Sequence, residues 1–194
     1  TPIISELRMS YIHGDANEWN ILIKENKVNA LIDFGDMVYS PLINELATAM
    51  TYICYDQEDV YEHILPLIYS YHQTITLHKK EISLLYYLIA AKLCISVCHS
   101  ANAKKEHPHN AYASISENNA WKMLNKMLEI NPIAFEKTLL TKLGIEKEQT
   151  KTENEKLTQR HQHLSKILSV SYDAPIAMEK AAFQYMYDAY GNTY

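Results

Sequence analysis

Two short acidic motifs, separated by a short stretch of chain, constrain this sequence more than any other feature. They lie in SYIHGDANEWNILIKENKVNALIDFGD, where HGD ends at Asp15, Asn20 follows five residues later and DFG begins at Asp33. The apolar runs between Asn20 and Asp33 predict a short β-hairpin, which would return Asp33 beside Asn20. The sequence therefore predicts that these side chains share one site.

Phosphoryl transfer is a reaction that residues of these types can support. It needs a carboxylate near the acceptor hydroxyl and oxygen ligands for the magnesium that bridges the phosphates. Asp15 fits the first role, and Asn20 with Asp33 fits the second, because Mg²⁺ usually takes one or two protein ligands plus waters and phosphate. The alternative is that each aspartate only forms a turn or caps a helix. Two motifs in the right order favour a site.

HGDANEWNIL followed by ALIDFGD resembles the aminoglycoside phosphotransferase and choline kinase branch of the protein-kinase-like fold, where HGD replaces HRD. DMVYSPLINELATAM extends the resemblance, which is nearest to hydroxylysine kinase-like members. The resemblance implies that Asp15 is the catalytic base, that His13 positions the catalytic loop, and that Asn20 and Asp33 bind magnesium. It also implies Mg²⁺ with ATP or GTP as cofactors and a small-molecule acceptor.

The sequence departs from that family pattern in two places. The turn Ala16-Asn17-Glu18-Trp19 lacks the usual Pro or Gly, and Glu45 stands where an Asp is commoner. Glu45 either braces the loop or is an exposed helix carboxylate. Glu18 and Asp36 are candidates for contact with a cationic acceptor, although surface exposure explains both equally well.

The predicted fold is mainly α with a small β-hairpin (α+β), the larger, C-terminal lobe of a protein-kinase-like fold. Four glycines are few for a turn-rich β fold. Apolar periodicity predicts several helices, at residues 42–55, 57–74, 79–99, 114–131 and 132–143. Pro66 predicts a kink or split, Gly144 a helix end, and Met9 to Ile12 a strand that leads into the catalytic loop.

Residues 79–99 are the most apolar segment and could be mistaken for a membrane span. However, the segment contains Lys92, and its uncharged run from Ile82 to Ala91 is shorter than the roughly 20 residues that a span needs. We therefore expect a helix buried in the centre of the lobe, with Tyr86 and Tyr87 in the core or lining a cleft, and no membrane partner.

Three parts are predicted along the chain: a kinase-like lobe at residues 1–144, a charged linker at 145–164 and the start of another domain at 165–194. In the last part, YMYDAYGNTY resembles the opening of class III pyridoxal-phosphate aminotransferases. No cofactor-binding residue of that family can be placed here, so pyridoxal phosphate would bind outside this chain. Only 12 residues precede His13 and no glycine-rich phosphate loop occurs, so we expect the smaller lobe upstream.

Composition limits the other possibilities. The net charge is −5 without a dense basic cluster, which argues against nucleic acid. Cys54, Cys94 and Cys98 lie in apolar helical surroundings and form no CxxC motif, and there is no leader, so we expect reduced core thiols and a cytoplasmic protein. His107 and His109 lack the third ligand that a metal site would need. A homodimer is compatible with the sequence.

The function expected from these observations is that of a small-molecule kinase. It would transfer the γ-phosphate of a nucleotide to a hydroxyl of an amino alcohol or similar metabolite, and would be fused to an aminotransferase or phospho-lyase-like enzyme. This chain alone is expected to be inactive. The alternative is a non-catalytic kinase-like module that binds or regulates, with the pyridoxal-phosphate enzyme as the main activity.

Overall fold

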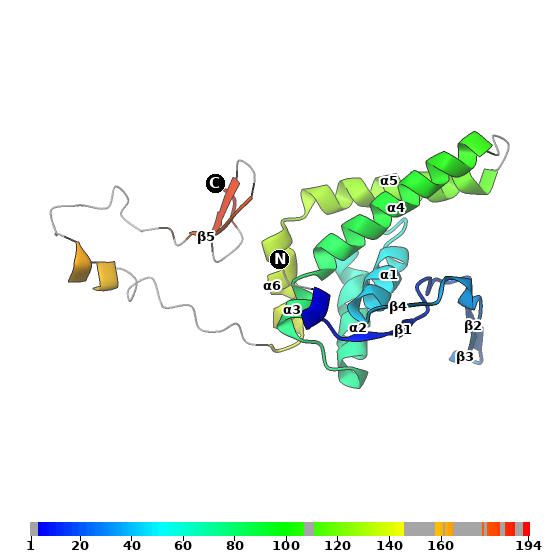
Figure 1. Ribbon diagram of the computed structural model, residues 1–194, viewed down its shortest axis with the longest axis horizontal. Helices are drawn as coiled ribbons and strands as arrows, with labels where there is room; N and C mark the ends of the chain where they lie inside the picture. The colour runs from blue at the N-terminus through cyan, green and yellow to red at the C-terminus, as the bar shows by residue number, and fades with distance from the viewer. Residues whose placement is uncertain are drawn as a thin grey trace. The chain divides into compact units, whose positions relative to one another are not determined.

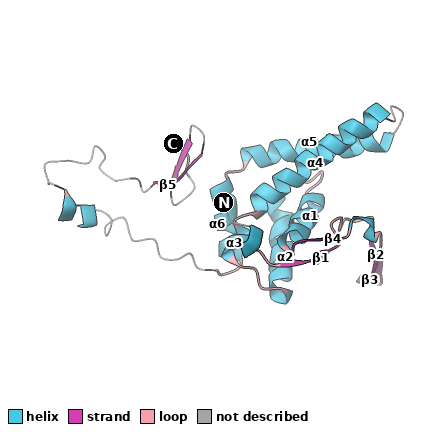
Figure 2. Cartoon of the chain, viewed as in Figure 1, coloured by secondary structure: helices cyan, strands magenta, loops and turns pink. Residues whose placement is uncertain are grey.

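The computed structural model describes residues 4–106, 111–145, 158–160, 162–164, 176, 178–182, 185–188 and 192–194. The chain divides into two compact units, Thr1–Ile130 and Asn131–Tyr194. The first unit contains both acidic motifs, so it contains the candidate site. Its elements and their order are shown in Figures 1 and 2.

Two small antiparallel sheets frame the motifs in the first unit. β1 (Met9–Ile12) pairs with β4 (Val38–Pro41), and this pairing closes the loop that carries HGD and DFG. β2 (Ile21–Lys24) pairs with β3 (Lys27–Leu31) through a two-residue turn whose residues both have positive φ. The predicted strand and the predicted hairpin are thus confirmed.

β4 was not among the predicted elements, because Pro41 is a local signal against a strand. Pro41 has no N–H to donate, yet it is tolerated at the end of a strand in a two-stranded sheet. The α+β character is confirmed, but it includes more β structure than one hairpin.

Four longer helices and one short one form the rest of the first unit. They are α1 (Ile43–Ile53), α2 (Val60–Thr74), α3 (Lys79–Ile82), α4 (Leu85–Glu106) and α5 (Ala111–Glu129). α4 lies alongside α5 and also packs on α1, which in turn packs on α2 (Figure 1). α2 runs through Pro66 as one helix, so the chain does not split there.

The predicted helix over 79–99 differs from the structure at both ends of α4. It is divided between α3 and α4, and α4 continues to Glu106, beyond the predicted end at residue 99. The added residues ANAKKE are polar but rich in good helix formers, which favours the continued helix. α5 likewise begins at Ala111, before the predicted start at 114.

α4 is buried on one face only, so the prediction of a helix buried in the lobe centre was wrong in part. Its fully buried residues recur every fourth position at Leu85, Ile89 and Leu93, whereas Tyr87 is 57% exposed. By length and composition, residues 79–106 could cross a membrane, with 28% of the apolar window buried. The absence of a membrane partner stays a prediction.

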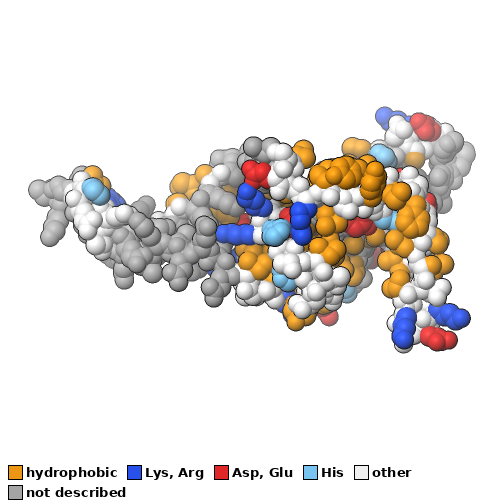
Figure 3. Space-filling view, turned by 60° about the horizontal axis from the view of Figure 1, so that its bottom comes forward, with side chains coloured by type: hydrophobic (Ala, Val, Ile, Leu, Met, Phe, Trp, Pro, Cys, Tyr) orange, Lys and Arg blue, Asp and Glu red, His pale blue; other side chains and the backbone are white. Residues whose placement is uncertain are grey.

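The β-sheets of the first unit also expose apolar side chains. Figure 3 shows hydrophobic side chains over the β2–β3 hairpin and charged ones at its tip. Ile23 and Val28 are 69% and 71% exposed, and Tyr11 of β1 stacks on Tyr39 of β4 at the surface. The core therefore lies among the helices rather than under the sheets.

The second unit begins with α6 (Pro132–Lys142), whose ends match the sequence signals. Asn131 caps the first turn, with Pro132 at the first helical position. Gly144 has φ +66°, and the Ile145 N–H donates to the Leu140 carbonyl at 3.0 Å, as in a Schellman motif. The predicted end at Gly144 is confirmed.

The end of the chain forms a hairpin of β5 (Met178–Ala182) and β6 (Tyr185–Asp188), with a further bridge from Tyr187 to Thr193. Most of the predicted linker, 146–157 and residue 161, lies outside the described residues, as do His107 and His109.

Candidate active site

The carboxylate of Asp15 lies at the centre of a set of hydrogen-bond donors. Its Oδ1 accepts from the Tyr52 hydroxyl at 2.5 Å and lies 3.9 Å from Lys92 Nζ. Its Oδ2 accepts from Asn17 Nδ2 at 2.9 Å and from Asn20 Nδ2 at 3.2 Å. Since a carboxylate has about four lone-pair sites, these neighbours fix both its position and its rotation.

His13 connects the HGD loop to the residue before Asp33. Its ring is 7% exposed, and Nδ1 accepts from the Asp15 backbone N–H at 3.3 Å. Nε2 therefore carries the proton and donates to the Ile32 carbonyl at 2.9 Å. The ring also packs 5.0 Å from that of Phe34. This geometry makes His13 a positioning residue for both motifs.

Asn20 and Asp33 meet through the backbone at the open end of the hairpin. The Ile32 N–H donates to the Asn20 carbonyl at 2.9 Å, which places Asp33 one residue beyond the pairing. Asn20 is 8% exposed, and its Nδ2 donates to the Asp15 carbonyl at 3.0 Å. Asp33 is exposed, and it has φ 62° with Oδ1 accepting from Gly35 N–H at 3.4 Å.

This pair of residues fits a magnesium ion of the kind that bridges phosphates. Asn20 uses its nitrogen for Asp15, so its oxygen Oδ1 is the atom that would bind the ion, together with the exposed carboxylate of Asp33. Within the described part of the chain, no three His, Cys, Asp or Glu side chains form a group that could hold a metal. Phosphate and water would therefore supply the remaining ligands.

Gly14 joins the two motifs and the first turn of α1. Its φ is +79°, and a Cβ added there would lie 2.7 Å from the Asp36 carbonyl oxygen. Its N–H donates to Glu45 Oε2 at 3.0 Å. The structure thus decides between the two interpretations of Glu45: this carboxylate braces the catalytic loop. Only glycine allows the DFG segment to approach the loop so closely.

Glu18 and Asp36 lie at different places around the site. Both are exposed. Burial raises the pKa of Tyr55, and the charges of Glu18 and Asp15 raise that pKa further, so both carboxylates act on the Tyr55 hydroxyl. Asp36 lies beside Gly14 and lines the rim of a cavity. The structure thus places Asp36 at a cavity.

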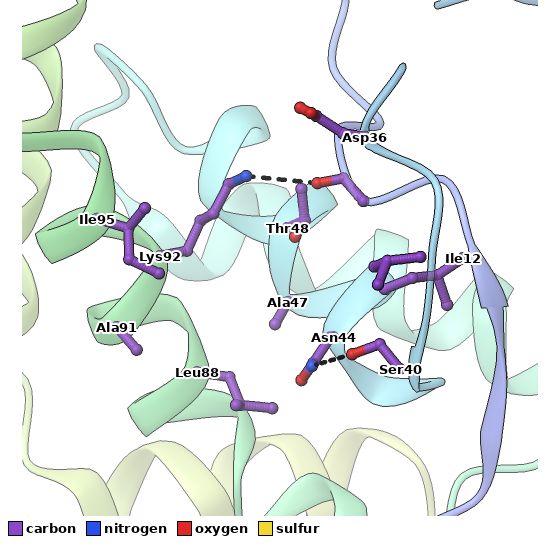
Figure 4. A pocket seen from close by; sticks show the side chains of 12 residues that line it. Ile12, Asp36, Ser40, Asn44, Ala47, Thr48, Leu88, Ala91, Lys92 and Ile95 are labelled. Carbon is purple, nitrogen blue, oxygen red and sulfur yellow. Dashed lines mark hydrogen bonds between the residues drawn. The ribbon is translucent and has the colours of Figure 1, made fainter. Parts of the chain in front are cut away.

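That cavity has a volume of about 350 Å³ and lies between β1, β4, α1 and α4 (Figure 4). Gly14, Asp36 and Lys92 border its polar side, where Lys92 Nζ donates to the Gly14 carbonyl at 3.4 Å. Asn44 donates through Nδ2 to Ser40 Oγ at 2.9 Å. Its Oδ1 is buried without a hydrogen-bond partner.

Asn17, Tyr52 and Lys92 belong to the site but were not predicted. For Lys92 a signal existed, since a lysine inside an apolar run of a helix needs a partner for its charge. Its partner is Asp15, 77 residues earlier in the numbering, and the ring of Tyr52 lies 5.6 Å from its Nζ. No local pattern marks Tyr52, because only the packing of α1 brings it to the loop.

Comparison with known proteins points to one family. Residues 2–69 match the phosphotransferase enzyme family, and this range contains all the predicted site residues. The chain is 27% identical to hydroxylysine kinase of Bos taurus over 146 residues, which are 69% of this chain and 38% of that protein. It is 25% identical to hydroxylysine kinase of Mus musculus over 143 residues, again 69% of this chain and 38% of the relative.

A third hydroxylysine kinase, from Danio rerio, is 25% identical over 124 residues, or 61% of this chain and 35% of the relative. The chain thus spans less than two fifths of the length of these relatives. No solved structure matches the chain significantly.

Proposed function

We propose that the first unit is the larger lobe of a small-molecule kinase, which transfers the γ-phosphate of ATP or GTP to a hydroxyl of an amino alcohol or a similar metabolite. One observation carries this proposal. The Asp15 carboxylate is held by donors beside Asn20, whose backbone is bonded to the residue before Asp33. The family match and the similarity to hydroxylysine kinases support a phosphotransferase.

In this proposal Asp15 orients the acceptor hydroxyl and accepts its proton. Each Asp15 oxygen already has two donors nearby, so one of these donors must yield its place to the substrate. Asn20 Oδ1 and Asp33 would hold Mg²⁺, which neutralises phosphate charge when bound. His13 keeps the loop and the Asp33 segment in register, and Gly14 allows them to pack.

The remaining parts of the proposal concern the whole protein. We propose a nucleotide-binding smaller lobe upstream and a class III aminotransferase or phospho-lyase-like domain downstream, with pyridoxal phosphate bound there. Phosphorylation would turn a hydroxyl into a leaving group, and a pyridoxal-phosphate enzyme could then eliminate phosphate. A cytoplasmic location, a homodimer and the lack of nucleic-acid and membrane partners belong to the same proposal.

The replacement Asp15→Asn in the complete protein tests the function. Assayed with Mg-ATP and a panel of amino alcohols that includes hydroxylysine and ethanolamine, turnover should fall about 10²- to 10⁴-fold, because the base is lost. Nucleotide affinity should stay within a factor of two. Asp56→Asn is the matched control, since Asp56 bonds only weakly to exposed Lys122 and should leave turnover unchanged.

Two results would contradict the proposal. Full turnover in Asp15→Asn would remove Asp15 from the base role. Binding of Mg-ADP by the unaltered protein without turnover of any acceptor would instead support the alternative, a kinase-like module that binds or regulates.

A further inference from the structure

We propose that the cavity between α1 and α4 is the subsite for a protonated primary amine on an alkyl chain, with Asn44 and Asp36 as its specificity-determining residues. This inference rests on the proposed function and deepens it. It assigns the amine of the acceptor to a cavity behind the catalytic loop instead of to Glu18 on the exposed turn. The lining residues are shown in Figure 4.

The position of the cavity connects it to the site of transfer. Gly14 and Lys92 form part of its wall, and both lie against Asp15, one through the chain and the other at 3.9 Å from the carboxylate. A molecule in the cavity would therefore lie against two residues that neighbour Asp15, and it would reach the carboxylate past Gly14 and Lys92. At about 30 Å³ for each water of liquid, a volume of about 350 Å³ suits a metabolite of modest size.

Asn44 has a buried side-chain oxygen without a hydrogen-bond partner. Its Nδ2 is bonded to Ser40 Oγ, whereas Oδ1 is buried without a partner. Native structures rarely leave a buried acceptor unpaired, and such groups need an explanation such as a bound water, a bound ion or a role in the site. Asn44 lines the cavity, so a donor bound there would satisfy Oδ1.

The charges around the cavity favour a cationic donor. Asp36 contributes a carboxylate at the rim. The charge of Lys92 is already engaged, because its Nζ donates to the Gly14 carbonyl and lies close to Asp15. Apolar side chains from β1, β4, α1 and α4, including Ile12 and Leu88, form the rest of the wall. An ammonium group on an alkyl chain matches all of these surroundings.

Binding of two probes to the complete protein tests the subsite without any transfer reaction. The probes are 5-aminopentan-1-ol and pentane-1,5-diol, which differ only in having an ammonium or a hydroxyl at one end. Titration calorimetry should give at least tenfold tighter binding of the amine, because a hydrogen bond between a cation and a fixed acceptor is stronger than a neutral one. Equal affinity for the two probes would overturn the proposal.

Two replacements of Asn44 then test the residue. Asn44→Leu should remove the preference for the amine, whereas Asn44→Asp keeps an acceptor of the same shape and should preserve or strengthen it. Tighter binding of the anion 5-hydroxypentanoate than of the amine by the unaltered protein, with loss of that anion binding in Asn44→Asp, would show that the site prefers negative charge and would overturn the proposal. Asn102→Leu on the exposed side of α4 is the control, since Asn102 donates to Glu106 of the same helix and does not line the cavity.

The outcomes separate this inference from the proposed function. Amine binding that depends on Asn44, without phosphate transfer to any acceptor, would support the amine subsite and contradict the proposed kinase function. Asn44→Leu could also keep the melting temperature of the unaltered protein and still transfer phosphate to amino alcohols with an unchanged KM. That result would support the proposed kinase function and contradict the amine subsite.

Discussion

The hydroxyl of Tyr52 donates to Asp15 Oδ1 at 2.5 Å and so joins α1 to the HGD loop across 37 residues of sequence. It occupies one of the positions from which an acceptor hydroxyl would approach the proposed base. The other oxygen, Oδ2, is held separately by Asn17 and Asn20. The orientation of Asp15 therefore does not depend on Tyr52 alone.

Replacement of Tyr52 by Phe should lower the KM for the acceptor about ten- to a hundredfold and leave kcat unchanged. The variant removes a competing hydrogen bond to a charged group, worth about 1.5–3 kcal/mol net, and keeps the ring beneath Lys92. Steady-state kinetics in the complete protein measures this. Tyr55→Phe is the control, because the Tyr55 ring contacts the Tyr52 ring but its hydroxyl does not bond to Asp15. A fall in kcat would mean that Tyr52 orients the base.

Gly14→Ala should reduce turnover strongly and lower the melting temperature, because it combines two penalties. A positive φ costs an alanine roughly 1–2 kcal/mol, and the new Cβ would lie 2.7 Å from the Asp36 carbonyl oxygen. Gly144→Ala is a matched control with φ +66° and nothing within 4 Å of the added Cβ. Its effect should be limited to stability. Equal losses in both variants would show that the contact with Asp36 has no cost.

Arg8→Ala should lower the free energy of unfolding by about 3 kcal/mol, because it leaves a buried carboxylate unpaired. Arg8 Nε and Nη2 donate to Glu81 Oε1 and Oε2 at 2.8 and 2.6 Å, and the Glu81 side chain is 4% exposed. Chemical denaturation measures the loss. Lys80→Ala removes the exposed pair with Glu6 and should change stability by less than about 1 kcal/mol.

The same ion pair predicts a pH dependence. Burial acts to raise the pKa of Glu81, but the hydrogen bonds from Arg8 and from the His78 backbone outweigh it and lower the pKa below 4.5. Because the folded-state pKa is the lower one, the stabilisation is complete above about pH 4.5 and is lost as the pH falls through the folded-state value. Between pH 6 and 2, the free energy of unfolding should fall less steeply in Arg8→Ala than in the unaltered protein. The same pH dependence in both proteins would contradict this prediction.

The three cysteines should differ in reactivity. The expectation of core thiols holds for Cys54 but is wrong for Cys94 and Cys98, which are exposed on α4. Burial raises the pKa of the Cys54 thiol to about 12, so almost no thiolate forms there at pH 8. Iodoacetamide followed by peptide mass spectrometry should therefore modify Cys94 and Cys98 first, and Cys54 only after denaturation. Rapid modification of Cys54 in the native protein would show that its helix opens readily.

The local part of the site could be predicted from sequence because neighbours along the chain determine it. The distance from Asp15 to Asn20 and the hairpin that leads to Asp33 depend on a few consecutive residues, and the structure brings these residues close together through the backbone. The strand β4 was missed for the opposite reason. Its pairing with β1 joins segments almost thirty residues apart, and Pro41 gave a local signal for a break.

Sequence alone determined the motifs, the hairpin and most helical segments, since each depends on short-range periodicity and turn chemistry. Tertiary structure decided which helix faces meet the catalytic loop: Glu45 bonds to Gly14, Tyr52 bonds to Asp15, and Lys92 approaches the same carboxylate. Helical periodicity shows which side of a helix is apolar, but it does not show against which loop that helix packs. The partners of Asp15 from α1 and α4 therefore depend on packing between segments far apart in the chain.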